Sequence, residues 1–308
     1  MNIGWNGTGI VQSASIARVA EDIAQAAERG FSSYWLADHP TGGFDALTAL
    51  AVARPADTDI ELGTAIVPTF PRHPMALASQ SLTTAQALDG RLTLGIGLSH
   101  ASMMAELGIP FEKPIRHLRE YLSILVPLLE HGEVDFKGEL LSCQAKVFKP
   151  DGGRCQVLVA ALGPQALRVA GRMASGTTLA WVGPKTIAEH IVPTISEAAA
   201  KHDRPAPRIM ATLPVCVSDT PDVVRQVIDK NLRMYGQLPS YRAMFDREGA
   251  AGPGDVALVG SADEVRDAVA QLQEAGVTDF CPTQFALSPE EKTATARLLD
   301  QMAAAAAA

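Results

Sequence analysis

The sequence predicts an α/β protein folded as a closed (β/α)8 TIM barrel, and three observations support this prediction. Short apolar segments of strand length alternate with longer segments of helical periodicity along nearly the whole chain. The strand segments are apolar on both faces, as expected for a parallel sheet covered by helices. The chain has 308 residues, which is enough for one barrel of about 250 residues with insertions. We therefore expect a single domain over residues 1–308, with an open doubly wound sheet as the alternative arrangement.

Eight segments are predicted as strands. The clearest is Leu92 to Gly97, where Gly95 and Gly97 occupy strand positions that would normally carry a side chain. Glycines at such positions indicate that something approaches the backbone closely. In chain order the predicted strands are Asn2 to Gly7, Tyr34 to Ala37, Ile60 to Val67, Leu92 to Gly97, Gln156 to Leu162, Thr177 to Trp181, Ile209 to Val217 and Val277 to Phe285.

Each predicted strand is followed by a helix with recognisable start and stop signals. Ser13 or Ser15 can cap the first helix, while Ser261 with Glu264 forms a capping box. Proline in a first turn and glycine after a last turn mark several other helix ends. The predicted helices are Ile16 to Gly30, Phe44 to Arg54, Pro74 to Gly90, Arg116 to His131, Pro164 to Ala174, Pro184 to Lys201, a helix after Thr220, Ser261 to Gly276 and a last helix from Ser288.

Two segments interrupt the alternation and are predicted as insertions. After the fourth strand, Val134 to Leu140 and Cys143 to Phe148 have the pattern of an inserted hairpin. Before the eighth strand, Tyr235 to Gly254 is rich in Gly and Pro with scattered aromatic residues. We expect this second insertion to be an irregular lid.

Composition and charge exclude several classes of protein. The formal net charge is -8 and the chain has no run of basic residues, which argues against nucleic acid as a partner. No apolar segment approaches the length of a membrane span, and the N-terminus lacks the features of a signal peptide. The four cysteines form no C-x-x-C pair, as in a reduced compartment. The prediction is a cytoplasmic protein without a membrane or nucleic-acid partner.

In a barrel of this kind the chemistry is placed at the carboxyl ends of the strands. No lysine follows an apolar strand and no H-x-H follows the first one, which disfavours a Schiff-base aldolase and a metallohydrolase. No metal site is therefore expected. The segment Gly95 to Gly97 contains G-x-G inside a strand rather than before a helix, so it does not fit a dinucleotide fingerprint. The residues predicted at the exits are Trp5, Asn6, Asp38, His39, Val67, Pro68, Ser99, His100, Leu162, Gly163, Trp181, Val217, Ser218, Thr283 and Gln284.

Two tryptophans, two histidines and one carboxylate suit a flat aromatic cofactor that brings its own chemistry. Gly163-Pro164-Gln165 opens a predicted helix whose free N–H groups can bind an anion or a phosphate. Trp5 and Trp181 are candidate substrate contacts, although a tryptophan at a barrel rim can equally belong to the core. Glu106 is an alternative acid beyond the fourth strand.

Several motifs, in this order, resemble the luciferase-like monooxygenase superfamily over nearly the whole chain, and more narrowly its branch that uses the deazaflavin coenzyme F420. This resemblance implies the TIM-barrel fold and a homodimer. The motifs are Leu62-Gly63-Thr64-Ala65-Ile66-Val67-Pro68, Arg72-His73-Pro74, Gly90-Arg91-Leu92-Thr93-Leu94-Gly95-Ile96-Gly97, Pro114-Ile115-Arg116-His117-Leu118, Ala161-Leu162-Gly163-Pro164-Gln165 and Gly260-Ser261 through Gly276-Val277.

The resemblance also implies roles for individual residues. The third-strand bulge, often with a non-proline cis peptide, would back the cofactor ring, and the segment before the helix at Pro164 would hold its phosphate. Asp38 and His39 align with a strand exit that carries a catalytic histidine in relatives, although Pro40 and the glycines after it depart from that pattern. Asp38, His39 and His100 are the catalytic candidates; the alternative is that Asp38 caps a loop and His39 is solvated. The implied cofactor-binding residues are Ala65, Ile66, Val67, Gly97, Ser99, His100, Ala161, Leu162, Gly163, Pro164 and Gln165.

Three functional hypotheses remain open from the sequence. The first is an F420-dependent oxidoreductase that transfers a hydride between the deazaflavin C5 and a small organic substrate. Reduction of a C=C or C=N bond in secondary metabolism fits it. The second is a monooxygenase of the same superfamily that uses flavin mononucleotide (FMN), and the third is a binding protein without a cofactor. The clustering of polar residues at the strand exits disfavours the third.

Overall fold

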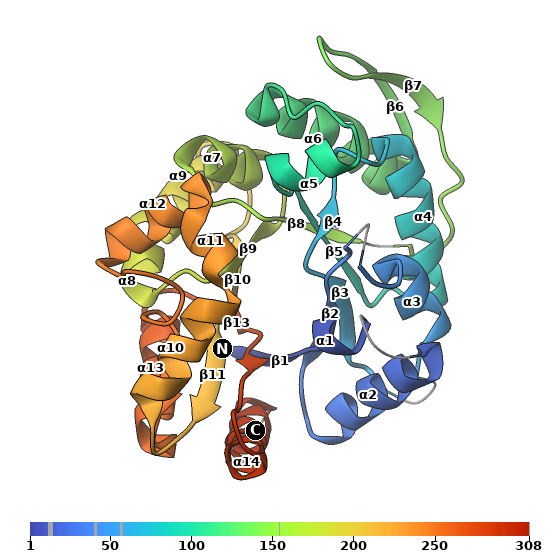
Figure 1. The fold of residues 1–308 in the computed structure, drawn as a ribbon. Helices are drawn as coiled ribbons and strands as arrows, with labels where there is room; N and C mark the ends of the chain where they lie inside the picture. Colours follow the sequence, from blue (N-terminus) through green and yellow to red (C-terminus); the bar gives the residue numbers. More distant parts are fainter. Residues whose placement is uncertain (12–14, 40–41, 56–57, 154, 308) are drawn as a thin grey trace.

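A computed structural model describes residues 1–11, 15–39, 42–55, 58–153 and 155–307. Its central element is a closed parallel barrel in the spatial order β3, β2, β1, β13, β10, β9, β8, β5, closed by pairing of β5 with β3 (Figure 1). The closure confirms the predicted barrel and excludes the open sheet. The barrel strands are β1 (Asn2–Asn6), β2 (Ser33–Leu36), β3 (Glu61–Thr64), β5 (Leu92–Gly97), β8 (Gln156–Val159), β9 (Gly176–Ala180), β10 (Arg208–Thr212) and β13 (Asp279–Phe280).

Helices surround the barrel (Figure 1), and their ends follow the sequence signals. Ser15 caps α2, because its hydroxyl accepts a hydrogen bond from Arg18 N; Ser13 lies outside the described residues. The capping box of Ser261 and Glu264 is present at α13. The helices are α1 (Thr8–Val11), α2 (Ile16–Glu28), α3 (Ala46–Val52), α4 (Pro74–Ala87), α5 (Ala101–Glu106), α6 (Pro114–His131), α7 (Pro164–Met173), α8 (Pro184–Thr186), a π-helical turn (Ile187–Ile191), α9 (Val192–Ala200), α10 (Pro221–Asn231), α11 (Arg233–Gln237), α12 (Pro239–Glu248), α13 (Ala262–Glu274) and α14 (Pro289–Ala307).

The first insertion is the predicted hairpin. Strands β6 (Glu133–Lys137) and β7 (Ser142–Lys146) pair antiparallel and extend away from the barrel (Figure 1). The buried Glu120 of α6 anchors the turn, since its carboxylate accepts hydrogen bonds from the backbone N–H groups of residues 139–141.

The second insertion differs from the irregular lid that the composition predicts, because it forms helices α11 and α12. Pro239 begins α12, and Gly249, in the left-handed conformation, ends it. These are ordinary helix start and stop signals, which the high Gly and Pro content of the segment obscured.

A small additional sheet extends three of the βα units beyond the barrel. It contains β11 (Pro214–Val217), β12 (Leu258–Gly260) and β14 (Thr283–Gln284). The predicted strand from Ile209 to Val217 is therefore two strands interrupted at Leu213, and β12 was not predicted. The third predicted strand is also divided, into β3 and the short β4 (Val67–Pro68).

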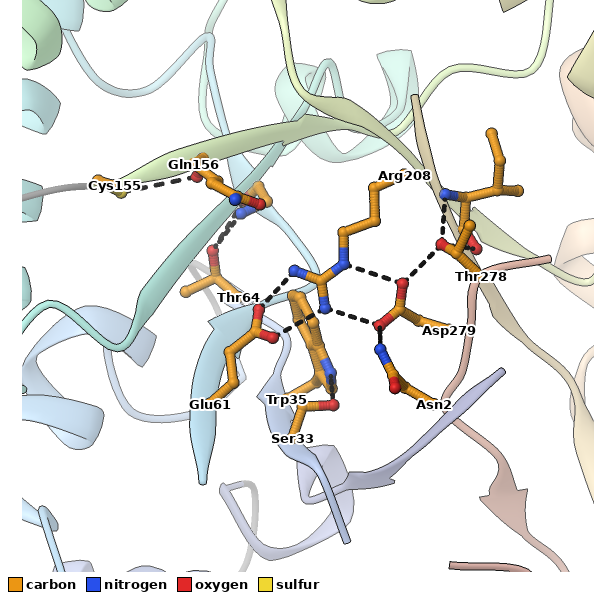
Figure 2. A network of polar contacts seen from close by, with 12 residues as sticks. Asn2, Ser33, Trp35, Glu61, Thr64, Cys155, Gln156, Arg208, Thr278 and Asp279 are labelled. Carbon is orange, nitrogen blue, oxygen red and sulfur yellow. Dashed lines mark hydrogen bonds and ion pairs between the residues drawn. The ribbon is translucent and has the colours of Figure 1, made fainter. Parts of the chain in front are cut away.

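The amino ends of the barrel strands are closed by a buried ion-pair network (Figure 2). The guanidinium of Arg208 donates two hydrogen bonds to Glu61, at 2.7 and 2.8 Å, and two to Asp279, at 2.9 and 2.8 Å. Above it, Trp35 fills the barrel, and a Cβ on Gly63 would lie 2.2 Å from the Trp35 ring. Trp35 packs with Leu158 of β8, Met210 of β10 and Cys281, which follows β13.

A cavity of about 600 Å³ lies at this amino-terminal end, lined among others by Glu61, Arg91 and Arg208. These charged groups are engaged with protein partners: Arg91 donates to the carbonyl oxygens of residues 58, 60 and 88. This end of a barrel usually serves stability, so the candidate site is sought at the opposite end.

Candidate functional site

The floor of the candidate site is a backbone bulge between β3 and β4. The peptide bond between Ala65 and Ile66 is cis, as the family resemblance implied for this position. Ala65 N donates to Leu36 O at 2.7 Å, and Asp38 N donates to Ile66 O at 3.2 Å. The bulge is thus joined by hydrogen bonds to the exit of β2.

The glycines of β5 accommodate this bulge. A Cβ on Gly95 would lie 1.9 Å from the Thr64 carbonyl oxygen. A Cβ on Gly97 would lie 3.0 Å from the side chain of Ile66 and 3.1 Å from Ala160 Cβ. The close approach expected from the sequence is real, and at Gly95 the chain's own third strand makes it. Gly97 is the point where the bulge meets the exit of β8.

Asp38 is buried at the exit of β2 and is bound by Arg72. Arg72 Nη2 donates to Asp38 Oδ2 at 2.8 Å and to Asp45 Oδ2 at 2.5 Å. Gln80 Nε2 donates to the other oxygen of Asp45 at 2.9 Å. Burial raises the pKa of Asp38 to about 6, against the lowering effect of Arg72, and Asp45 adds a smaller increase. Asp38 is therefore part of an ion-pair network with Arg72 and Asp45, and this network fixes the backbone next to His39.

His39 and His100 both lie at the mouth, at the exits of β2 and β5. Burial lowers the pKa of His39. Burial also lowers the pKa of His100, and the nearby His39 lowers it further. Both imidazoles are therefore neutral near pH 7, and each can donate through one ring nitrogen and accept through the other. Glu106, the alternative acid, is exposed at the end of α5.

Two of the predicted exit residues have backbone conformations that side chains rarely adopt. Ser99 has φ of 61° and Trp181 has φ of 60°. A bulky residue in the left-handed region is an outlier, and such outliers cluster at functional sites. Trp181 directly follows β9 and Ser99 stands two residues after β5, so both lie at strand exits.

Trp181 belongs to an aromatic cluster that the sequence analysis did not identify. The ring centroids of Trp181 and Tyr235 are 5.6 Å apart, and those of Tyr235 and Tyr241 are 5.0 Å apart. The His100 ring lies 6.3 Å from Tyr235 and 5.9 Å from Tyr241. The aromatic content of the second insertion was the available signal, but its partners could not be assigned without the tertiary fold.

Trp5 is placed differently from the prediction. Its Nε1 donates to Asp22 Oδ2 at 3.1 Å, and Arg29 stacks on its ring, 4.4 Å from the centroid. The Tyr34 hydroxyl donates to the same carboxylate at 2.7 Å. Trp5 therefore packs toward α2, outside the barrel, and is not retained as a substrate contact.

The N-terminus of α7 is open to a ligand. Gly163 is the N-cap residue, no side chain of the described residues caps the helix, and its first turn contains no acidic residue. A Cβ on Gly163 would meet nothing within 4 Å. The preceding Leu162 is held through its carbonyl oxygen, 2.9 Å from His190 Nε2. An uncapped N-terminus with free N–H groups fits a phosphate, so the residues present suit a phosphate-bearing cofactor.

The residues that the structure describes form neither a metal cluster nor a membrane-spanning helix. Within the described ranges, no group of three or more His, Cys, Asp or Glu is arranged to hold a metal ion. In the same part of the chain, no helix has both the length and the apolar character that a membrane span requires.

Beyond the fold and the bulge at the barrel mouth, comparison with known proteins identifies the family. The family model for luciferase-like monooxygenases matches residues 3–279. The chain belongs to this family.

One curated relative is the F420-dependent glucose-6-phosphate dehydrogenase of Beutenbergia cavernae, 30% identical over 213 residues. That match covers 65% of this chain and 63% of the relative, so it spans less than two thirds of the relative's length. The name of this relative agrees with the resemblance to the F420-dependent branch.

Solved structures show the same fold. The coenzyme F420-dependent tetrahydromethanopterin reductase of Methanopyrus kandleri superimposes with a TM-score of 0.76 at 22% identity, covering 97% of both chains. The oxygenating constituent of 3,6-diketocamphane monooxygenase of Pseudomonas putida, in complex with FMN, gives a TM-score of 0.74 at 18% identity and covers 98% of this chain and 97% of its own. At these identities the likeness concerns the fold alone.

Proposed function

We propose that this protein is an F420-dependent oxidoreductase that transfers a hydride between the deazaflavin C5 and a small organic substrate. The observation that carries the proposal is the contact, at Gly97, between the Ala65–Ile66 bulge and the exit of β8 at Ala160. Three residues after Ala160, Gly163 begins α7 with an uncapped N-terminus, so the bulge and this helix end lie at the same mouth. A ring on the bulge and a phosphate at α7 would be two ends of one cofactor. The F420 dependence named for the relative favours deazaflavin over FMN.

Each part of the site has a role in this proposal. The N–H groups of the first turn of α7, which no side chain caps among the described residues, would hold the phosphate, and the bulge at residues 65–67 would support the ring. When bound, the deazaflavin supplies the position that donates or accepts the hydride. A ring nitrogen of His39 or His100 gives or takes the accompanying proton at the substrate, which the neutral state of both imidazoles permits. The Arg72–Asp38 pair holds the loop before His39.

The cofactor is identified by titration. Purified protein is titrated with coenzyme F420 and separately with FMN, and binding is followed by intrinsic tryptophan fluorescence from the three tryptophans. We expect saturable micromolar binding of F420 and much weaker binding of FMN. Tight binding of FMN alone would instead establish the flavin monooxygenase, the second candidate that the solved FMN complex supports. Binding of neither would refute both.

A variant pair tests the phosphate site. Gly163→Glu places a carboxylate in open space at the N-terminus of α7, where it repels a phosphate and caps the free N–H groups. We expect it to weaken F420 binding at least about tenfold. Gly163→Gln has the same size without the charge and serves as the matched control. Equal affinities of the two variants would remove α7 from the cofactor site.

The homodimer implied by the resemblance is part of the same proposal. Light scattering of the purified protein measures its mass in solution, and a mass of one chain would contradict it.

A further inference from the structure

The second insertion places an aromatic cluster over the mouth of the barrel. Its members are Trp181 at the exit of β9, Tyr235 on α11, Tyr241 on α12 and His100 at the exit of β5. We refer to these four residues as the aromatic cage. Two come from strand exits and two from the insertion, so the cage bridges the barrel and the helices above it.

Helix α12 holds its side of the cage in a defined position. The Glu248 carboxylate accepts hydrogen bonds from Lys185 N at 3.2 Å and Thr186 N at 2.7 Å, which caps α8. Phe245 is fully buried, and Arg242 donates to carbonyl oxygens just beyond the end of the same helix. Tyr241 is thus carried by a helix that is fixed to α8, the helix that follows Trp181.

The polar tips of the cage make few hydrogen bonds within the described part of the chain. Trp181 is 8% exposed, and its buried Nε1 has no partner there at ordinary hydrogen-bond geometry. Its N–H does interact with the Tyr235 phenol: burial raises the pKa of that phenol, and a hydrogen bond from Trp181 lowers it by a smaller amount. For the Tyr241 hydroxyl and the His100 ring, no hydrogen bond to any described residue is present. A buried indole N–H without a well-aligned acceptor is costly, so a ligand acceptor beside Trp181 would gain a hydrogen bond that the protein itself satisfies poorly.

The cage carries no charge near pH 7. Burial raises the pKa values of Tyr235 and Tyr241, and burial also lowers the pKa of His100. Arg72, a cation between β4 and α4, is already bound by two carboxylates. On the insertion, Arg233 is exposed and stands two positions before Tyr235, which directs it to another face of the helix.

We propose that the aromatic cage is the substrate subsite and that it selects an uncharged planar molecule with a carbonyl-type acceptor. The aromatic faces bind the plane, and Trp181 Nε1 and the Tyr241 hydroxyl donate to the acceptor. A phosphorylated sugar, the substrate named for one relative, is disfavoured because none of the four cage residues is a cation and burying its charge without one is unfavourable. The inference rests on the proposed function for the reaction that the bound molecule undergoes. Binding of that molecule to the cage can be measured whether or not the reaction is F420-dependent.

The test uses acetophenone as an uncharged planar ketone, benzoate as its charged counterpart of similar size, and glucose 6-phosphate. Each is titrated into the full-length protein, with and without saturating F420, and tryptophan fluorescence is recorded. Trp181→Phe removes the cage donor and its fluorescence, whereas Trp5→Phe removes the tryptophan that packs on α2 and is the matched control. Tyr241→Phe removes one hydroxyl and keeps the ring.

We expect saturable quenching by acetophenone in the wild type and in Trp5→Phe, and loss of that quenching in Trp181→Phe. Tyr241→Phe should weaken acetophenone binding about fivefold, as loss of one neutral hydrogen bond does. Benzoate should bind at least tenfold more weakly, and glucose 6-phosphate should not compete. Equal or tighter binding of either anion, equal quenching in the two tryptophan variants, or no binding of acetophenone would each overturn the assignment.

The two proposals fail in different ways. If the cage assignment is wrong while F420 dependence is right, F420 still binds and Gly163→Glu still weakens it. If F420 dependence is wrong while the cage is right, acetophenone still quenches Trp181 in the cofactor-free protein.

Discussion

Replacing Arg208 by methionine should destabilise the protein by about 3–5 kcal/mol, because it leaves a buried charge without its partner. The side chain of Arg208 is 18% exposed, that of Glu61 28% and that of Asp279 only 4%. Glu61 can recover water when the guanidinium is removed, whereas Asp279 cannot. Asp279 keeps two donors, Asn2 Nδ2 at 3.1 Å and Thr278 Oγ1 at 2.6 Å. These partial replacements place the expected loss near the lower value, about 3 kcal/mol.

Urea unfolding of the wild type and Arg208→Met, followed by circular dichroism, measures this difference. The corresponding fall in melting temperature is about 6–12 °C. Arg54→Met removes the exposed pair with Asp89, whose side chains are 40% and 61% exposed, and should cost less than about 1 kcal/mol. Similar losses in the two variants would refute the argument from burial.

The pH dependence gives an independent check on Asp279. Burial raises the pKa of this carboxyl, but Arg208 and its other donors lower it more, so its pKa lies below the usual value of 3.8. The stabilisation from a depressed pKa is complete above 3.8 and is lost as the pH falls through the folded-state pKa. The difference between wild type and Arg208→Met should therefore be largest near pH 7 and shrink below about pH 4. A difference that grows on acidification would contradict the assignment.

Two further stability predictions follow from single positions. Gly95→Ala should destabilise the protein by about 2–3 kcal/mol or more, because its Cβ would lie 1.9 Å from the backbone oxygen of Thr64. Gly236→Ala is the control: a Cβ there meets nothing within 4 Å, and alanine should stabilise α11 by about 0.5–1 kcal/mol. Equal effects of the two substitutions in urea unfolding would contradict this prediction. Asp38→Asn removes a carboxyl whose pKa burial raises from 3.8 to about 6. A carboxyl with a raised pKa destabilises the folded state while it is ionised, and protonation removes this penalty as the pH falls. Between pH 7 and pH 4 the wild type should therefore gain on the order of 2 kcal/mol of stability relative to Asp38→Asn. A difference that does not change with pH would show that Asp38 does not titrate as described.

Much of the fold could be predicted because its signals are local. The apolar faces of Leu92–Gly97 predicted a strand buried on both sides, and all six of its residues are buried. The serine and glutamate at positions 261 and 264 predicted a capping box, which the structure contains. Gly163 and Pro164 predicted a helix start, and α7 begins there. Strand, cap and helix start each depend on residues a few positions apart.

The orientation of side chains around the barrel depended on strand register. Trp5 pairs with Tyr34 across β1 and β2, and both contact Asp22 outside the barrel. Trp35, the next residue along β2, points inward and fills the barrel. A strand places successive side chains on opposite faces. When both faces are apolar, the sequence pattern does not predict which face becomes the barrel interior.

The sequence by itself determined the alternation of strands and helices, and with it the barrel and the strand exits where polar residues gather. Only the tertiary structure decided that the Thr64 carbonyl oxygen leaves room for no side chain at Gly95. The same holds for the proximity of His39 to His100 and for the packing of Tyr235 and Tyr241 beside Trp181. Periodicity and capping are set by neighbouring residues, whereas these contacts join segments far apart in the chain. Such contacts form only when closure of the barrel brings the strand ends together.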